Sequence, residues 1–315
     1  MIAFVFPGQG SQKVGMAKFL YDEFKSAKET LEEASDILKT DMEALMFTDP
    51  NDELNLTQNT QPALVIAATI YHRSLKEVYG VPALISAGHS LGEYSALVAN
   101  GVMTFQDALL LTRQRGAAMQ KAVPVGEGAM LAVIGANDTD LLSAIKETEG
   151  TVEVANYNCP GQIVVSGSAS GIANLKEFDT ASRFGKKWKM IPLKVSAPFH
   201  CSLMQPAEDA MRPLIEGCEM QAPLAPVIQN YSALESTDVN AIKSQLIQQI
   251  TGSVRWTASI ERMGELGVKK IIEVGPGKVL SGLVKKIDSA AFKSFNIENL
   301  ADFKAIEAEL VFNEQ

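Results

Sequence analysis

The segment GHSLG at 88–92 constrains this chain more than any other feature of its sequence. The residues before it, Ala83 to Ala87, are apolar and partly β-branched, which is typical of a buried strand. The residues after it, 93–100, are helix formers that stop at Gly101. Ser90 is therefore predicted to lie in a sharp strand–turn–helix bend, where a G-x-S-x-G pattern presents a nucleophilic hydroxyl.

Glycine is expected at both ends of this pattern for a steric reason. A side chain at Gly88 or Gly92 would collide as the strand and the helix close around the turn. The turn also directs backbone N–H groups, that of Leu91 among them, at the space beside the hydroxyl, where they can stabilise an oxyanion. The pattern is also compatible with a purely structural turn, so the chemistry depends on what else the chain supplies.

The composition is that of a large globular protein, with 315 residues, 46% hydrophobic and 21% charged. A net charge of −9 argues against wholesale nucleic-acid binding. The cysteines, Cys159, Cys201 and Cys218, are too few and too scattered for a disulfide framework or a zinc site, and they indicate a reducing compartment. The first residues lack a signal-peptide pattern, and no run reaches the roughly 18 apolar residues of a membrane span. We therefore expect a cytoplasmic protein without membrane contact.

The order of predicted elements indicates an α/β fold in two parts. Through residue 124, and again from 196 to 315, strands alternate with helices as in a parallel sheet covered on both faces. Residues 125–195 follow the order strand, helix, strand, strand, helix, strand, which is the ferredoxin-like arrangement. We therefore expect a large domain of residues 1–124 and 196–315, with a small domain of residues 125–195 inserted. Single elements expected include helices at 12–23, 170–183 and 301–311 and strands at 188–195 and 226–232.

A serine hydroxyl needs a base that removes its proton, and the chain has three histidines. His72 falls within a predicted helix, which favours a packing or surface role. His89 lies in the bend itself, where its side chain should point away from that of Ser90. His200 follows Pro198 in a loop after a predicted strand, a place that often carries catalytic groups. We therefore expect His200 to be the base.

Two further features of the sequence suggest other chemistry. The glycine loop at 8–10 fails the dinucleotide fingerprint, because Lys13 stands where glycine is required, and it lacks the Walker lysine placement. It fits better a loop that brings backbone close to another site. Cys201 is a rival nucleophile, but nothing in the sequence suggests that the pKa of its thiol is lowered.

Nine segments, spread in order over nearly the whole chain, identify a family as a set. They are FVFPGQGSQ (4–12), TQPAL (60–64), GHSLGEYSAL (88–97), RG-AMQ-AVP (115–124), G-AM (128–130), N-N-PGQ (156–162), PFH (198–200), V-W-T (254–257) and EVGPGKVL (273–280). On these segments the chain resembles the malonyl-CoA:acyl carrier protein transacylases of type II fatty acid synthesis. It is also similar to the acyltransferase domains of polyketide synthases. The resemblance implies an α/β-hydrolase-like core with an inserted ferredoxin-like lid.

The resemblance also implies a role for each catalytic residue. Ser90 would take the acyl group, with His200 as its general base and then as general acid for the leaving thiol. The backbone N–H groups of Gln9 and Leu91 would form the oxyanion hole, which accounts for the glycine loop at 8–10.

Three further residues are implied to contact the substrate. Arg115 would bind the malonyl carboxylate, and a planar guanidinium suits this because it takes both oxygens at once, whereas Arg113 cannot share its helix face. Phe199 matches the malonyl-selecting rather than the methylmalonyl-selecting acyltransferases. Arg255 stands where some family members have glutamine. It lies in the segment SVRWT (253–257), whose main-chain carbonyl is expected to orient the histidine.

The implied reaction has two halves and needs no cofactor or metal. The serine takes malonyl from malonyl-CoA, and the phosphopantetheine thiol of acyl carrier protein then removes it; the resemblance suggests a monomer. Acyl carrier protein is typically acidic, so we expect a basic docking patch. The candidates are Lys186, Lys187 and Lys189, or Lys285 and Lys286.

Three alternatives stay open on the sequence. The acceptor could belong to a polyketide pathway, which would make the chain a trans-acting acyltransferase. A serine thioesterase or hydrolase shares the bend, but it has no need of an arginine for a carboxylate and usually carries an acidic residue between serine and histidine. A non-catalytic scaffold is disfavoured by the intact Ser90, His200 and glycine loop.

Overall fold

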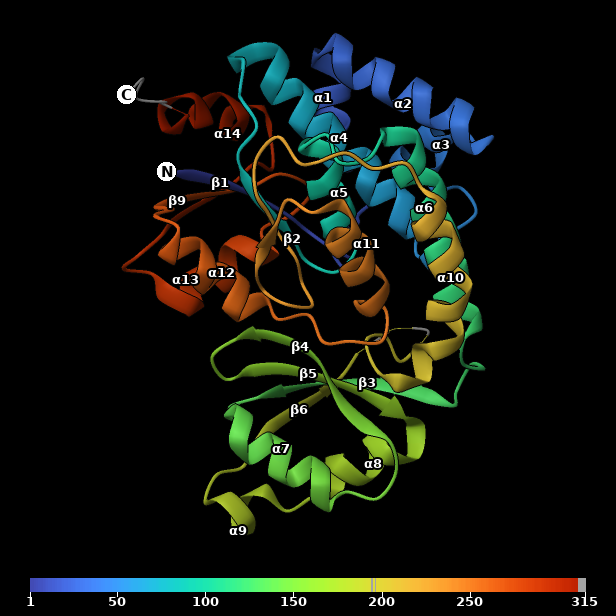
Figure 1. Ribbon diagram of the computed structural model, residues 1–315, viewed down its shortest axis with the longest axis vertical. Coiled ribbons are helices and arrows are strands. Elements are labelled where there is room, and N and C mark those ends of the chain that lie inside the picture. Colours follow the sequence, from blue (N-terminus) through green and yellow to red (C-terminus); the bar gives the residue numbers. More distant parts are fainter. Residues whose placement is uncertain (194, 196, 311–315) are drawn as a thin grey trace.

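A computed structural model describes residues 1–193, 195 and 197–310 (Figure 1). The strands of its larger part are β1 (Ile2–Phe6), β2 (Ile85–Gly88), β7 (Val227–Ile228), β8 (Glu235–Ser236), β9 (Lys270–Glu273) and β10 (Lys293–Asn296). They form one sheet in the order β10-β9-β1-β2-β7-β8. The strands from β10 to β7 run parallel, and the short edge strand β8 runs antiparallel to β7. The predicted α/β class with a parallel sheet is confirmed.

Helices cover both faces of this sheet. They are α1 (Lys18–Glu23), α2 (Lys25–Leu38), α3 (Met42–Phe47), α4 (Thr57–Tyr79), α5 (Gly92–Ala99), α6 (Phe105–Lys121), α10 (Gln205–Gly217), α11 (Val239–Gln248), α12 (Trp256–Glu265), α13 (Val279–Asp288) and α14 (Leu300–Ala305), with 3-10 turns at Ser202–Met204 and Ile306–Glu309. Successive side chains of a strand point to opposite faces. Phe4 and Phe6 of β1 therefore pack in a core with α4 and α6, whereas Ala3 and Val5 pack with α12 and α13.

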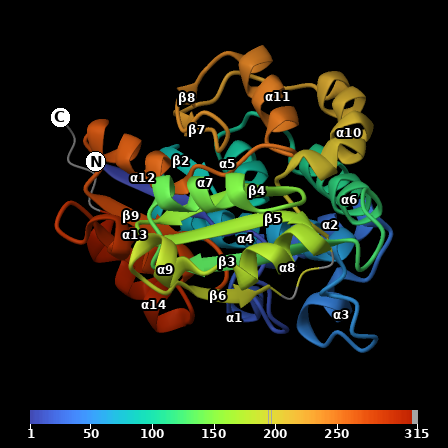
Figure 2. The ribbon, with the colours of Figure 1, turned by 90° about the horizontal axis from the view of Figure 1, so that it is seen from below.

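The chain between residues 128 and 192 forms a second sheet. Its strands are β3 (Gly128–Ile134), β4 (Val152–Cys159), β5 (Gln162–Ser168) and β6 (Lys189–Pro192), antiparallel in the order β4-β5-β3-β6. The helices α7 (Asp138–Glu147), α8 (Ala169–Glu177) and α9 (Thr180–Phe184) lie over one face of it (Figure 2). This order of elements confirms the ferredoxin-like arrangement. The division into domains at 124/125 and 195/196 stays a prediction, and Ser196 lies outside the described residues.

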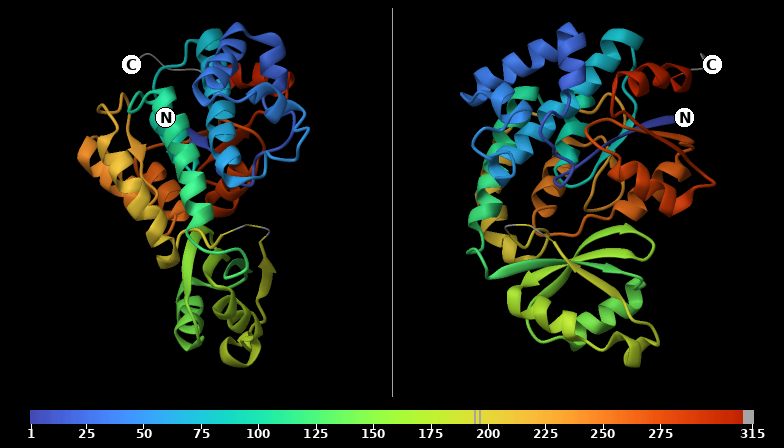
Figure 3. Two further views of the ribbon diagram at one scale, coloured as in Figure 1. Left: turned by 90° about the vertical axis from the view of Figure 1, so that its right-hand side faces the viewer. Right: turned by 180° about the vertical axis from the view of Figure 1, so that it is seen from behind.

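The two parts meet along β4 (Figure 3). The backbone of Val254 forms a bridge to this strand, donating to the oxygen of Ala155 at 2.8 Å and accepting from the N–H of Tyr157 at 2.9 Å. The face of the small sheet that α7 and α8 leave uncovered joins the main core through Met130 and Val164. The small sheet is therefore packed directly against the larger part.

Two helices differ from the sequence prediction for local reasons. The helix expected at 12–23 begins only at Lys18, because Gly15 and Ala17 have φ values of +82° and +64° that a helix cannot contain. The helix expected over 170–183 is broken into α8 and α9. Asp179 begins the second one by accepting the N–H of Ser182, as an N-cap does.

The remaining differences concern chain ends and sheet edges. The strand expected at 226–232 is reduced to the two residues of β7, and the sequence did not predict β8 or β10. The strand expected at 188–195 ends at Pro192, and the helix expected at 301–311 ends in a 3-10 turn, with residues 194 and 311 outside the description. Among the described helices, none is long and apolar enough to cross a membrane.

Candidate active site

Ser90 lies in the turn between β2 and α5, at the C-terminal edge of the parallel strands. Its φ of +51° is in the left-handed region, which non-glycine residues seldom adopt, and His200 shares it with a φ of +60°. A Cβ at Gly88 would lie 1.8 Å from the carbonyl carbon of Gly92, and a Cβ at Gly92 would lie 2.1 Å from the oxygen of Phe6. The bend can therefore close only with glycine at both positions.

The hydroxyl of Ser90 meets the imidazole of His200, with Oγ 2.7 Å from Nε2. Nδ1 of His200 lies 2.8 Å from the main-chain oxygen of Gln249, which can only accept a hydrogen bond. Nδ1 therefore carries the ring proton, and Nε2 is free to accept from the serine hydroxyl. Burial and the charge of Arg115 lower the pKa of His200 to about 3, so the ring is neutral at pH 7.

The carbonyl that orients His200 does not come from the segment 253–257, and that prediction is wrong. It belongs to Gln249, immediately after α11 ends at Gln248. The last carbonyls of a helix have no partner within it, so this oxygen is available to the imidazole. The segment 253–257 serves another purpose, because Val254 forms the bridge to β4.

Arg115 on α6 is 1% exposed and reaches Ser90. Nη1 donates to Oε1 of Gln61 at 3.0 Å, and Nη2 donates to Oε1 of Gln249 at 2.8 Å and to Oγ of Ser90 at 3.3 Å. Its Nε has no partner within the described part of the chain. A guanidinium held by neutral amides with an N–H to spare can receive a carboxylate. Arg113 points elsewhere, to the connection between α2 and α3.

The backbone N–H groups of Gln9 and Leu91 follow neighbouring strands. β1 and β2 are in register with Phe6 opposite Gly88, and the N–H of His89 donates to the oxygen of Phe6 at 3.0 Å. Gln9 follows Phe6 by three residues, and Leu91 follows Gly88 by three residues. Both therefore lie just beyond the same edge of the sheet. Within the described residues neither N–H has an acceptor. Both are available to a substrate oxygen, and the one of Leu91 stands at the N-terminus of α5.

Sequence reasoning missed three fully buried polar residues that hold these groups in place, namely Glu93, Asn230 and Gln249. Asn230 follows β7, accepts the N–H of Ser90 at 2.6 Å and donates to the oxygen of Gly88 at 2.6 Å. Glu93 in α5 accepts from the N–H of Asn230 at 2.9 Å and from Nε2 of Gln249 at 2.8 Å. Polar residues that end an apolar parallel strand are a known signal of a site, and they could have indicated Asn230.

The other histidines and Cys201 take no part in this arrangement. Nε2 of His89 lies 2.8 Å from Oδ1 of Asn158 on β4, so the ring faces the small sheet. His72 packs edge-on against Phe4, and burial lowers its pKa to about 4. Cys201 is fully buried, and burial raises the pKa of its thiol, which opposes formation of a thiolate nucleophile.

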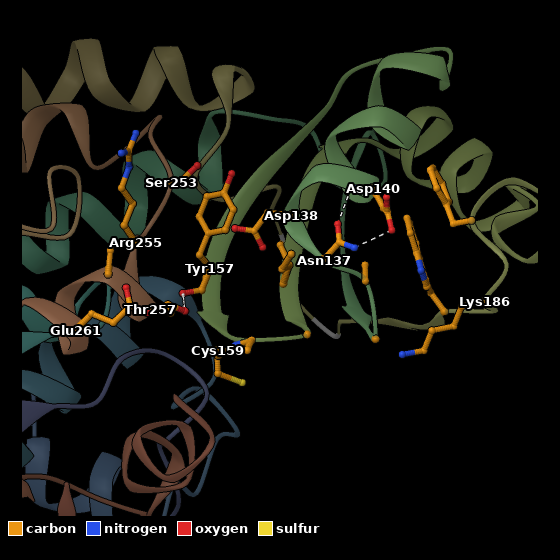
Figure 4. Close-up of a pocket in the computed structure, with 18 residues that line it drawn as sticks. Asn137, Asp138, Asp140, Tyr157, Cys159, Lys186, Ser253, Arg255, Thr257 and Glu261 are labelled. Carbon is orange, nitrogen blue, oxygen red and sulfur yellow. Dashed lines mark hydrogen bonds between the residues drawn. The ribbon is translucent and has the colours of Figure 1, made fainter. Parts of the chain in front are cut away.

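Phe199 and Arg255 lie in different surroundings. Phe199 is buried next to His200 in the chain. Arg255 is exposed and lines a separate cavity of about 920 Å³ at the junction of the two parts, across from Tyr157 (Figure 4). Neither Ser90 nor His200 is among the described residues that line this cavity. The substrate-binding role of Arg255 therefore stays a prediction, since the structure does not bring it to the catalytic groups.

Comparison with known proteins decides the family. A family model described as an acyl transferase domain matches residues 3–294. The chain belongs to this acyl transferase domain family. Among its relatives, the malonyl CoA-acyl carrier protein transacylase of Bacillus subtilis is 46% identical over 291 residues, which cover 91% of this chain and 90% of that protein. The transacylase of the same name from Escherichia coli is 43% identical over 287 residues, or 90% and 92% of the two chains.

Solved structures of acyl transferases share the whole fold. The malonyl CoA-acyl carrier protein transacylase of Clostridium perfringens superposes with a TM-score of 0.93 at 38% identity, covering 98% of this chain and 96% of that one. A malonyl-transacylase in complex with a type II PKS acyl-carrier protein superposes with a TM-score of 0.92 at 40% identity, covering 98% and 99%. The two-sheet architecture is therefore that of the family.

Proposed function

We propose that this acyl transferase moves the malonyl group of malonyl-CoA to the phosphopantetheine thiol of acyl carrier protein, through a malonyl ester on Ser90. The observation that carries the proposal is the 2.7 Å contact of Ser90 with a neutral His200, beside the buried guanidinium of Arg115. The substrate and the partner are supported by the names of the relatives and by the solved complex with an acyl-carrier protein. The product supplies fatty acid elongation.

In the first half-reaction, Nε2 of His200 takes the proton of Ser90 while Oγ attacks the thioester carbonyl. The N–H groups of Gln9 and Leu91 stabilise the oxyanion that forms, because within the described residues they have no other acceptor to give up. When the oxyanion collapses, the C–S bond breaks and His200 gives its proton to the sulfur of CoA. The second half-reaction reverses these steps, with the thiol of acyl carrier protein as nucleophile.

Arg115 selects an acyl group that carries a carboxylate. Burying a carboxylate without a partner would cost several kcal/mol. The free Nε and Nη2 would offer it parallel hydrogen bonds, with the carboxylate replacing the 3.3 Å contact of Nη2 with Ser90. Phe199 limits the space for a branch on the acyl chain, and one methyl group discriminates by roughly 10–200-fold. We retain Arg255 as a proposed substrate contact outside the catalytic centre.

The surroundings of the site define the rest of the proposal. The large domain would comprise residues 1–124 and 196–315 and the small one residues 125–195, with the acyl ester held between them and shielded from water. Acyl carrier protein would dock on Lys186, Lys187 and Lys189, of which Lys186 lines the separate cavity, or on Lys285 and Lys286 at the end of α13. We propose a monomer that works in the cytoplasm.

A second candidate function differs only in the acceptor. The solved malonyl-transacylase bound to a type II PKS acyl-carrier protein is 40% identical to this chain, which supports a polyketide carrier protein as the second candidate acceptor. A serine hydrolase is disfavoured because a main-chain oxygen, and not a carboxylate, orients His200. A non-catalytic scaffold would not need the contact between Ser90 and His200.

Incubation with malonyl-CoA alone distinguishes an acyl transferase from a serine hydrolase and from a non-catalytic scaffold. We expect about one equivalent of CoA to be released per protein, followed by a stall that ends when acyl carrier protein is added. Continuous release without the carrier would show a hydrolase, and no release at all would show a scaffold.

A further inference from the structure

Glu93 is a buried carboxyl group to which the reaction described above gives no role. It lies in the first turn of α5 with 0% exposure. Its Oε2 accepts from the N–H of Asn230 and from Nε2 of Gln249, and its Oε1 has no partner within the described residues. A buried carboxylate that lacks partners is unfavourable unless a nearby charge compensates for it.

The side-chain amide of Gln249 joins Glu93 to Arg115. Nε2 of this amide donates to the carboxyl group at 2.8 Å, and Oε1 accepts from Nη2 of the guanidinium at 2.8 Å. The partners of Arg115 among the described residues are two amides and one hydroxyl, so no carboxylate touches it directly. Glu93, one amide away, is the carboxyl group placed to balance its charge.

We propose that Glu93 is the internal counter-charge of Arg115 and takes up a proton when a malonyl carboxylate pairs with Arg115. Before binding, the guanidinium and the carboxylate balance each other across Gln249. The malonyl carboxylate brings a second negative charge into the same water-poor space, where two carboxylates against one guanidinium are unfavourable. A proton from solvent converts Glu93 to the neutral acid and restores one cation and one anion. This inference rests on the proposed role of Arg115.

The ionisable groups around this pair leave Glu93 as the one that titrates near neutrality. Burial raises its pKa to about 7, against the opposing effect of the two hydrogen bonds and of Arg115 on α6. His200 has its pKa lowered to about 3, Tyr94 on α5 has its pKa raised to about 12, and burial lowers the pKa of His89 in the bend. β1 and β2, which pack against α5, carry no ionisable side chain. α4 also packs against α5, and burial lowers the pKa of its His72 to about 4 and raises the pKa of its Tyr71.

The sign of the resulting pH dependence follows from linkage. A malonyl group favours the protonated form of Glu93, so the affinity for malonyl-CoA falls as the pH rises above 7, by up to about tenfold per pH unit. An acetyl group brings no charge, so the affinity for acetyl-CoA does not follow this dependence.

Calorimetric titration of the Ser90→Ala protein, which cannot form the ester, measures the proton directly. The heat of binding is compared in buffers of different ionisation enthalpy, with malonyl-CoA and with acetyl-CoA. At pH 8 we expect the protein to take up about one proton more when it binds malonyl-CoA than when it binds acetyl-CoA. Adding Glu93→Gln to the Ser90→Ala protein should abolish this difference in proton uptake between the two thioesters. The matched control is Glu208→Gln on α10, because Glu208 is also buried but pairs with Arg212 and Thr251.

Equal proton uptake for the two thioesters, or a difference that survives Glu93→Gln, would overturn the inference. If malonyl-CoA binds without the extra proton, the role of Glu93 alone fails, whereas failure to bind malonyl-CoA at all contradicts the proposed function. If Glu93→Gln does not fold, infrared difference spectra of the Ser90→Ala protein decide the matter. The carbonyl stretch of a newly protonated carboxylic acid must then appear with malonyl-CoA and not with acetyl-CoA, and its absence counts against Glu93.

Discussion

At the residue scale, the guanidinium of Arg115 has lost nearly all contact with water. Two neutral amides and a hydroxyl replace the solvent, and none of them carries a negative charge. Such a cation attracts an anionic group from the substrate far more strongly than an exposed arginine does, because the surrounding medium screens it less. Under the proposed function, the acyl group would therefore be selected close to the nucleophile itself.

Replacing Arg115 by alanine should separate malonyl from acetyl transfer. Hydrogen bonds to charged groups contribute about 1.5–3 kcal/mol each, so the loss of two of them should lower kcat/KM for malonyl-CoA by at least about 100-fold. The value for acetyl-CoA should be kept or raised, because acetyl makes no use of the guanidinium. Steady-state kinetics with both thioesters measure the two effects, with Arg113→Ala as the control on the same helix. An equal loss for both substrates would remove Arg115 from its assigned role.

Phe199 should govern tolerance of a branched acyl chain. Phe199 is buried and directly precedes His200 in the chain, so we expect Phe199→Ser to open space near the acyl group. We expect the preference for malonyl-CoA over methylmalonyl-CoA to weaken by about tenfold or more, within the range that one methyl group allows. Competition between the two thioesters for one carrier protein gives the ratio. An unchanged ratio would show that Phe199 does not face the branch.

The pH dependence of acylation reports the state of His200. Only the neutral imidazole accepts the serine proton, and burial keeps its pKa at about 3, well below the ordinary value of about 6.5. The rate of ester formation at saturating malonyl-CoA should therefore stay nearly constant from about pH 7 down to about pH 5. Rapid-quench measurements of CoA release test this, and a loss of half the rate near the ordinary histidine pKa would contradict it.

At the element scale, the approach of β2 to α5 fixes where Ser90 stands. Gly88→Ala would place a methyl group within 1.8 Å of the backbone of Gly92, so we expect a loss of stability of at least about 3 kcal/mol or no folded protein. Gly282→Ala on α13 is the control, because an added Cβ there meets no atom within 4 Å. It should be neutral or stabilise by about 0.5–1 kcal/mol. Urea unfolding measures both, and a mild effect of Gly88→Ala would contradict this packing.

The elements around the bend could be predicted because their signals are local. The apolar run before Gly88, the helix formers after it and the stop at Gly101 all lie within about twenty residues of sequence. The edge strands β8 and β10 could not be predicted, since they are only two and four residues long and exist through pairing with neighbours. The break between α8 and α9 depends on one capping side chain, that of Asp179.

At the scale of the whole molecule, the site joins residues that are far apart in the sequence. Ser90 and His200 are separated by 110 positions, and their proximity was predictable by elimination because the chain has three histidines. Gln249 and Asn230 were not predictable in this way. Their roles depend on where α11 and β7 end in space, and a buried amide looks the same in the sequence as an exposed one.

The central claim is that Ser90 carries a malonyl ester on the way from CoA to acyl carrier protein. Peptide mass spectrometry after brief exposure to malonyl-CoA tests it most directly, with Ser90→Ala as the control. We expect the mass of one malonyl group on the peptide that contains Ser90, its absence in the variant and its disappearance when acyl carrier protein is added. A malonyl mass on another residue, or none in a protein that still transfers malonyl, would contradict it.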